Sequence, residues 1–121
     1  ALLLGVGAAV GVDIDPQACH EARINASQNG VAGRFSVIAG PVQAVGEGSF
    51  DLVLANLRPP TLAELLPVLG SGSLLAGDGR LILSGFRADE QPGLERLLPA
   101  GMSVEWQEKD RDWAAMVIRQ G

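Results

Sequence analysis

Short apolar runs alternate with stretches of helical character along the chain, and no other feature limits its fold as strongly. Strands are predicted over residues 10–14, 34–39, 50–56 and 80–84. Helices are predicted over residues 16–28, 61–75 and 88–98. Strands that alternate with helices build a mostly parallel sheet, because each helix carries the chain back across it. The sequence therefore predicts an α/β domain.

The first predicted helix has well-defined ends. Asp15 is a suitable N-cap, and Pro16 fits the first helical position, where no N–H group is needed. Asn29-Gly30 tolerates the left-handed conformation that ends many helices. Small residues recur at every fourth position of this helix, at Ala18, Ala22 and Ala26. This stripe predicts a face that packs closely on a sheet.

Other segments have less regular patterns. The strand over residues 50–56 is almost continuously apolar, which predicts burial on both faces. Gly77-Asp78-Gly79 is predicted to form a turn before the next strand. Residues 1–4 are interpreted as the end of a core helix. The last part of the sequence predicts an antiparallel hairpin, with strands over residues 103–109 and 113–119 around 110–112.

Composition limits the class of protein and its partners. Apolar residues make up 47% and charged residues 19% of the chain, as in a globular protein. No apolar run reaches the roughly 18 residues that a membrane span needs. The net charge of −5 gives no overall attraction to nucleic-acid phosphates, so a protein is the favoured partner. The single cysteine, Cys19, forms no internal disulfide and suits a cytoplasmic protein.

A glycine-rich segment near the start is similar to a nucleotide-binding loop. Gly5, Gly7 and Gly11 supply the glycines. A phosphate-binding loop follows a strand and opens a helix, whereas these glycines precede the strand at residues 10–14. We therefore interpret them as a turn between a helix and a strand.

Two polar residues at predicted strand ends are the main site candidates. Asp13 ends the first strand, at the sheet edge where ligands of open α/β sheets bind. Its carboxylate can accept hydrogen bonds from both hydroxyls of an adenosine ribose, although a solvated strand-end acid is the alternative. Asn56 ends the strand over residues 50–56, where its amide could orient a substrate amine. The alternative for Asn56 is a turn-forming residue.

Several other residues are given structural interpretations. His20 has no paired nucleophile and is predicted at the surface, and Asp15 is explained by helix capping. Ser84 lacks the preceding glycine of a nucleophile elbow. Trp106 and Trp113 are predicted to pack across the hairpin. No set of side chains has the spacing of a metal site.

Four segments in this order resemble the class I S-adenosylmethionine-dependent methyltransferases. They are Gly11-Val12-Asp13-Ile14-Asp15-Pro16, residues 22–31, Phe50-Asp51-Leu52-Val53-Leu54-Ala55-Asn56-Leu57 and Gly79-Arg80-Leu81-Ile82-Leu83-Ser84-Gly85. The resemblance covers nearly the whole chain. It is strongest to the catalytic domain of the bacterial enzymes that methylate a large-subunit ribosomal protein, protein eleven.

The resemblance implies a fold and a set of site residues. The fold is a Rossmann-like sheet with helices on both faces and strand order 3-2-1-4-5-7-6, the seventh strand antiparallel. Asp13 corresponds to the ribose-binding acid and Ile14 to the residue beside the adenine. The family's adenine pocket continues at Gly40, Pro41 and Val42. Asn56 corresponds to the asparagine near the substrate, and S-adenosylmethionine is the implied cofactor.

The chain departs from the family pattern at two places. The family's first strand and glycine loop are expected upstream of residue 1, so residues 1–121 are expected to form the C-terminal part of a catalytic domain. A domain without that strand would have open sheet edges through which copies could associate. The segment after Asn56 is Leu57-Arg58-Pro59-Pro60, which is not the Asn-Pro-Pro-aromatic motif of base and glutamine methyltransferases.

The resemblance implies methyl transfer to amine nitrogens of a protein, with a ribosomal protein as a candidate substrate. Three alternatives remain: a non-catalytic fragment of the same fold, a nucleic-acid N-methyltransferase, and a nicotinamide-dependent oxidoreductase. The last of these also uses an acid after its second strand, but the Asn56 segment and the terminal hairpin fit it poorly.

Overall fold

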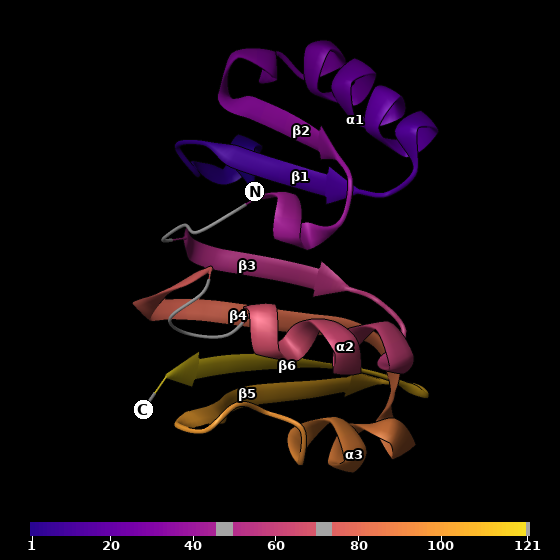
Figure 1. Ribbon diagram of the computed structural model, residues 1–121, viewed down its shortest axis with the longest axis vertical. Helices are drawn as coiled ribbons and strands as arrows, with labels where there is room; N and C mark the ends of the chain where they lie inside the picture. The colour runs from indigo at the N-terminus through magenta and orange to yellow at the C-terminus, as the bar shows by residue number, and fades with distance from the viewer. Residues whose placement is uncertain (46–49, 70–73, 121) are drawn as a thin grey trace. The chain divides into compact units, whose positions relative to one another are not determined.

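The computed structural model describes residues 1–45, 50–69 and 74–120 (Figure 1). The described strands are β1 (Ala9–Asp13), β2 (Phe35–Ala39), β3 (Phe50–Asn56), β4 (Leu75–Arg87), β5 (Met102–Asp110) and β6 (Trp113–Gln120). The described α-helices are α1 (Pro16–Gln28), α2 (Pro59–Leu69) and α3 (Gln91–Glu95). Short 3-10 turns lie at Leu2–Leu4, Ala32–Arg34, Val42–Val45 and Ala88–Glu90. The chain divides into two compact units, Ala1–Gly46 and Glu47–Gly121.

The strand pairing has the order expected from the class I methyltransferase pattern. In the first unit β1 pairs with β2 in parallel, and in the second unit the order is β3-β4-β6-β5. β3 and β4 are parallel, whereas β6 runs antiparallel to β4. The last four strands therefore follow the predicted order 4-5-7-6, with the final strand of the chain antiparallel. The α/β fold class is confirmed.

The first unit is a strand, a helix and a parallel strand, as predicted. The Asp15 carboxylate accepts a hydrogen bond from the Gln17 N–H at 2.9 Å, and Pro16 occupies the first helical turn. Gly30 follows the helix with φ of 71°, the left-handed conformation that its sequence position predicts. Along α1, Ala26 is buried, and Ala18 and Ala22 are half-buried. The small side chains let the helix lie close on β1 and β2.

Glycines in the first unit have structural roles. Gly5 ends the Leu2–Leu4 turn with φ of 108°, as a turn interpretation requires. A Cβ atom at Gly11 would lie 2.9 Å from the Phe35 ring, so Gly11 lets the aromatic side chain cover β1. The prediction of a core helix at residues 1–4 is wrong, because the segment is a single 3-10 turn and Leu4 is 92% exposed.

The second unit contains most of the buried apolar core. Leu62, Leu66 and Leu69 of α2 pack toward the sheet. The sheet face beneath them carries Leu81, Leu83, Met116 and Ile118, all of which are fully buried. Phe86 and Leu94 extend this core toward α3. A helix that connects two parallel strands must bury its apolar side in this way.

Several predicted boundaries in the second unit need correction. β4 already begins at Leu75, so the predicted helix over residues 61–75 ends too late; residues 70–73 of that prediction lie outside the described residues. Gly77-Asp78-Gly79 does not form the predicted turn before a strand. It lies inside β4, at the point where the pairing register with β3 shifts. The helix predicted over residues 88–98 consists of a 3-10 turn at Ala88–Glu90 followed by the short α3.

The predicted burial of β3 on both faces is also wrong. Leu52 is 40% exposed and Leu54 is 60% exposed, whereas Ala55 is buried. Side chains alternate between the faces of a strand, and Ala55 shares its face with the core under α2. Leu52 and Leu54 therefore point to the opposite face. The predicted hairpin is confirmed, with Arg111 at φ of 58° in its two-residue turn.

Candidate functional site

In the first unit, the carboxyl ends of β1 and β2 bring the predicted cofactor residues together. Asp13 and Ala39 are paired at the ends of the two parallel strands. Ile14 follows Asp13, and Gly40, Pro41 and Val42 follow Ala39. The Gly40 N–H donates a hydrogen bond to the Asp13 carbonyl at 2.9 Å, which joins the two segments. Residues far apart in the sequence thus lie at one edge of this sheet.

The Asp13 side chain is fixed at this edge. Its Oδ1 atom accepts a hydrogen bond from the Asp15 N–H at 2.9 Å, and the side chain is exposed. An ionised carboxylate has about four acceptor positions, so one backbone N–H leaves acceptor capacity toward solvent. Ile14 is 78% exposed beside it. An oriented carboxylate next to an exposed apolar side chain fits the ribose and base of an adenosine-type ligand.

In the second unit, Asn56 ends β3 directly opposite Ser84 of β4. The Ser84 hydroxyl donates a hydrogen bond to Asn56 Oδ1 at 3.2 Å. The next residue, Leu57, donates its N–H to the Ser84 carbonyl at 3.1 Å. A carbonyl oxygen has two lone pairs, so Asn56 Oδ1 can accept a further N–H group. Asn56 therefore has an oriented amide oxygen at the carboxyl end of two parallel strands.

The residue after Ser84 must be glycine for this geometry. Gly85 has φ of 87°, which side chains with a Cβ atom rarely adopt. A Cβ atom there would lie 2.7 Å from the Leu57 carbonyl oxygen and 2.8 Å from Asn56 Oδ1. The close approach of two backbone segments thus shapes the turn that carries Asn56.

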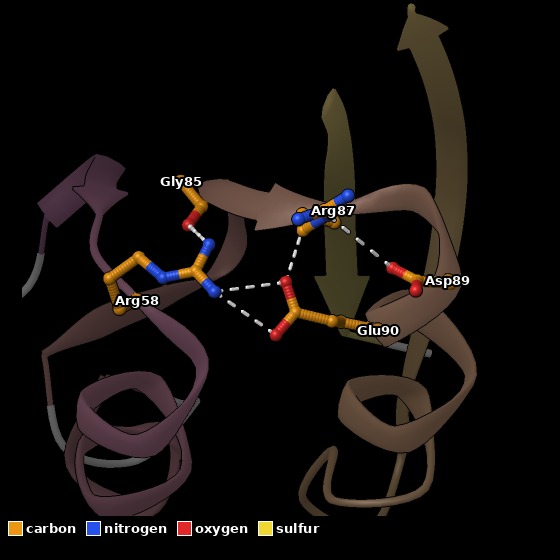
Figure 2. A network of polar contacts seen from close by, with 5 residues as sticks. All are labelled: Arg58, Gly85, Arg87, Asp89 and Glu90. Atoms are coloured by element: carbon orange, nitrogen blue, oxygen red, sulfur yellow. Dashed lines mark hydrogen bonds and ion pairs between the residues drawn. The ribbon is translucent and has the colours of Figure 1, made fainter. Parts of the chain in front are cut away.

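Arg58 connects this turn to a second segment (Figure 2). Its Nη1 donates to the Gly85 carbonyl at 3.0 Å, and its Nη2 lies 3.1 Å from both oxygens of Glu90. Its guanidinium carbon also lies 5.7 Å from the centre of the Trp113 ring, within cation–π distance. The arginine therefore contacts β4, the turn after it and the start of β6.

The other polar residues considered from the sequence have structural surroundings. Cys19 is buried, and its thiol lies 3.5 Å from the Asp13 carbonyl oxygen and 3.7 Å from that of Ile38. His20 is exposed, as predicted. Trp113 lies opposite Asp110 and Trp106 opposite Val117, so the tryptophans do not face each other across the hairpin.

Two functional candidates were missed from the sequence. The sequence presents Ser84 only as a possible nucleophile and Arg58 only as a departure from a known motif. A usable signal was present for Ser84, because it ends the strand predicted to follow the one that carries Asn56, and carboxyl ends of parallel strands share an edge. The partners of Arg58 depend on the turn geometry at Gly85, which no pattern in the sequence indicates.

Two surface hollows in the described part of the chain lie away from these strand ends. One of about 300 Å³ lies between α1 and β2 and includes Arg23 and Phe35. Another of about 440 Å³ lies beside α3 and includes Gln91 and Gln107. Over residues 1–45, 50–69 and 74–120, no three His, Cys, Asp or Glu side chains are grouped as metal ligands. No helix in that part of the chain is long and apolar enough to cross a membrane.

A family model described as ribosomal protein L11 methyltransferase (PrmA) matches residues 1–121. Among curated proteins, the ribosomal protein L11 methyltransferase of Pelotomaculum thermopropionicum is 40% identical over 121 residues, which cover 98% of this chain and 38% of that protein. The corresponding protein of Pelobacter propionicus is 38% identical over 125 residues, covering 99% of this chain and 38% of that protein. The chain thus spans 38% of the length of these two relatives.

A solved structure shares the fold described above. It is a ribosomal protein L11 methylase from Lactobacillus delbrueckii subsp. bulgaricus, with a TM-score of 0.91 and 27% sequence identity. The match covers 99% of this chain and 62% of that chain. Both sequence and fold therefore point to the same group of methyltransferases.

Proposed function

The chain belongs to the ribosomal protein L11 methyltransferase family, and we propose a function for the gene product, meaning the protein in which this chain occurs. The gene product transfers methyl groups from S-adenosylmethionine to amine nitrogens of a ribosomal protein. The observation that carries the proposal is the oriented amide of Asn56, whose Oδ1 accepts the Ser84 hydroxyl at 3.2 Å at the end of β3. A ribosomal protein as substrate implies a cytoplasmic enzyme, which suits the free thiol of Cys19.

Asp13 and its neighbours would hold the cofactor. The carboxylate would accept hydrogen bonds from the ribose hydroxyls, since its hydrogen bond to the Asp15 N–H already fixes its orientation. Ile14 and the segment formed by Gly40, Pro41 and Val42 would contact the adenine, with any polar contact from backbone groups. When bound, the sulfonium supplies an activated methyl group that needs no acid to assist the leaving group.

Asn56 would orient the acceptor amine. Its Oδ1 would accept an N–H group of the amine, so that the nitrogen lone pair points toward the methyl carbon. Methyl transfer depends mainly on such alignment, because the two reacting atoms must lie in line. The amine must also be deprotonated, which partial exclusion of water favours by disfavouring the charged form.

The proposal is tested by mass spectrometry of ribosomal protein L11 incubated with the gene product and S-adenosylmethionine. We expect methylated lysine or terminal amine, and we expect Asn56→Ala to lower kcat roughly a hundred-fold through lost alignment. Asn25→Ala is the matched control, because Asn25 is an exposed asparagine of α1. Absence of methylation by the unsubstituted protein would contradict the proposed function and favour a non-catalytic member of the family.

A further inference from the structure

Arg58 contacts three separate parts of the second unit. Two residues after Asn56, it lies near a backbone carbonyl, a carboxylate and an aromatic ring from three later segments. The Gly85 carbonyl accepts at 3.0 Å, the Glu90 carboxylate at 3.1 Å, and the Trp113 ring centre lies at 5.7 Å. All of these residues lie in the second unit, as does Asn56.

Glu90 is held in place independently of Arg58. Its Oε1 accepts the Arg87 N–H at 2.8 Å, which fixes the carboxylate across the Ala88–Glu90 turn (Figure 2). The Ala88 N–H in turn donates to the Asp112 carbonyl at 2.8 Å, which joins this turn to the hairpin. Arg58 therefore meets an acceptor whose orientation is already determined, and less side-chain freedom is lost when the pair forms.

We propose that Arg58 is a positioning residue of the acceptor site, which holds the turn at Asn56 against Ser84 and Gly85 by bridging the Gly85 carbonyl and Glu90. The proposal rests on the function proposed for Asn56. The bridge from Arg58 holds the segment that follows Asn56, in which the Leu57 N–H also donates to the Ser84 carbonyl. Ser84 in turn donates its hydroxyl to Asn56 Oδ1 and so orients the amide.

The geometry requires arginine specifically. The guanidinium uses Nη1 for the carbonyl and Nη2 for the carboxylate, and its central carbon lies over the Trp113 ring. A lysine ammonium is a single charged point on a flexible stem and lacks this planar fork. We therefore expect Arg58→Lys to retain the attraction to Glu90 but to lose part of the fixed turn geometry.

The bridge is expected to act locally and not on global stability. The Arg58 side chain is 52% exposed and that of Glu90 is 30% exposed, and ion pairs of this kind contribute little to the stability of a whole protein. Local opening of the turn at Asn56 is a separate equilibrium from global unfolding. Loss of the Arg58–Glu90 pair is expected to favour the open form of this turn directly.

The first test is amide hydrogen exchange of Leu57, combined with the NMR signals of the Asn56 side-chain NH₂ group. In Arg58→Ala and Glu90→Gln we expect Leu57 exchange to accelerate roughly three- to ten-fold. We expect the Asn56 NH₂ signals to shift in both variants and Arg58→Lys to restore part of the protection. Asp89→Asn is the control, since it removes one negative charge from the same turn at a side chain that is 81% exposed. Equal exchange in Arg58→Ala and Asp89→Asn would overturn the positioning role.

The second test separates this inference from the proposed function. In the methylation assay we expect Arg58→Ala to lower kcat several-fold, with an unchanged KM for S-adenosylmethionine and activity partly restored in Arg58→Lys. An unchanged kcat, despite faster Leu57 exchange, would overturn the role of Arg58 while leaving the proposed function intact. If the unsubstituted protein does not methylate, the proposed function fails and with it the acceptor-site role, whatever the exchange data show about the bridge.

Discussion

Gly85 is the residue at which a single methyl group has the largest expected effect on the acceptor site. Gly85→Ala would place a Cβ atom 2.7 Å from the Leu57 carbonyl oxygen at φ of 87°. We expect the free energy of unfolding to fall by roughly 1–3 kcal/mol, measured by urea denaturation. Gly77→Ala is the control from the same strand, because a Cβ atom at Gly77 would meet no other described part of the chain within 4 Å. Equal losses in the two variants would contradict the close approach at Gly85.

At the scale of residues, polar side chains at strand ends can be predicted from the sequence, whereas contacts between turns cannot. Asp13 and Asn56 could be predicted because an acid or amide directly follows an apolar run. The structure places both at the carboxyl ends of parallel strands, while their roles remain proposals. The Arg58 bridge could not be predicted, because Glu90 is 32 residues away in the chain and is brought near by the Gly85 turn.

At the scale of elements, helix α1 offers a direct test of local sequence signals. The Asp15 carboxylate caps the helix through the Gln17 N–H at 2.9 Å. We expect Asp15→Ala to lower the free energy of unfolding by about 1 kcal/mol, whereas Asp15→Ser should retain most of the cap. Urea denaturation followed by circular dichroism measures both variants. A similar loss in the alanine and serine variants would show that the cap does not explain the stability of this helix.

Elements with strong local signals were predicted well, and those shaped by neighbours were not. The ends of α1 follow from Asp15-Pro16 and Asn29-Gly30, whose preferences are local. The segment Gly77-Asp78-Gly79 has equally strong turn residues, yet it lies within β4 as an irregularity, because β4 pairs with β3 on both sides of it, at Leu75 and at Arg80. The helix predicted over residues 88–98 begins where predicted, because the Glu90 carboxylate caps its start by accepting the Arg87 N–H, but only Gln91–Glu95 is α-helical.

For the whole molecule, the division into two units predicts that the units differ in their ability to fold alone. The large apolar side chains of Leu62, Leu83, Phe86 and Met116 are fully buried in the second unit, whereas the buried apolar residues described in the first unit are the smaller Cys19, Ala26 and Val31. Small cores rarely offset the entropy of ordering a chain. We expect a fragment of residues 47–121 to unfold cooperatively in urea and a fragment of residues 1–46 to remain unfolded. A cooperative transition in the shorter fragment would contradict this distribution of stability.

At the scale of the whole molecule, Asp13 is the residue through which we propose that the chain holds a methyltransferase cofactor. The most direct measurement is calorimetric titration of the gene product with S-adenosylhomocysteine. We expect binding by the unsubstituted protein and by Asp51→Asn, which removes an exposed acid from β3. Asp13→Asn should bind at least about ten-fold more weakly, since hydrogen bonds to a charged group are lost. Absence of binding by the unsubstituted protein, or equal affinity in Asp13→Asn and Asp51→Asn, would contradict the account.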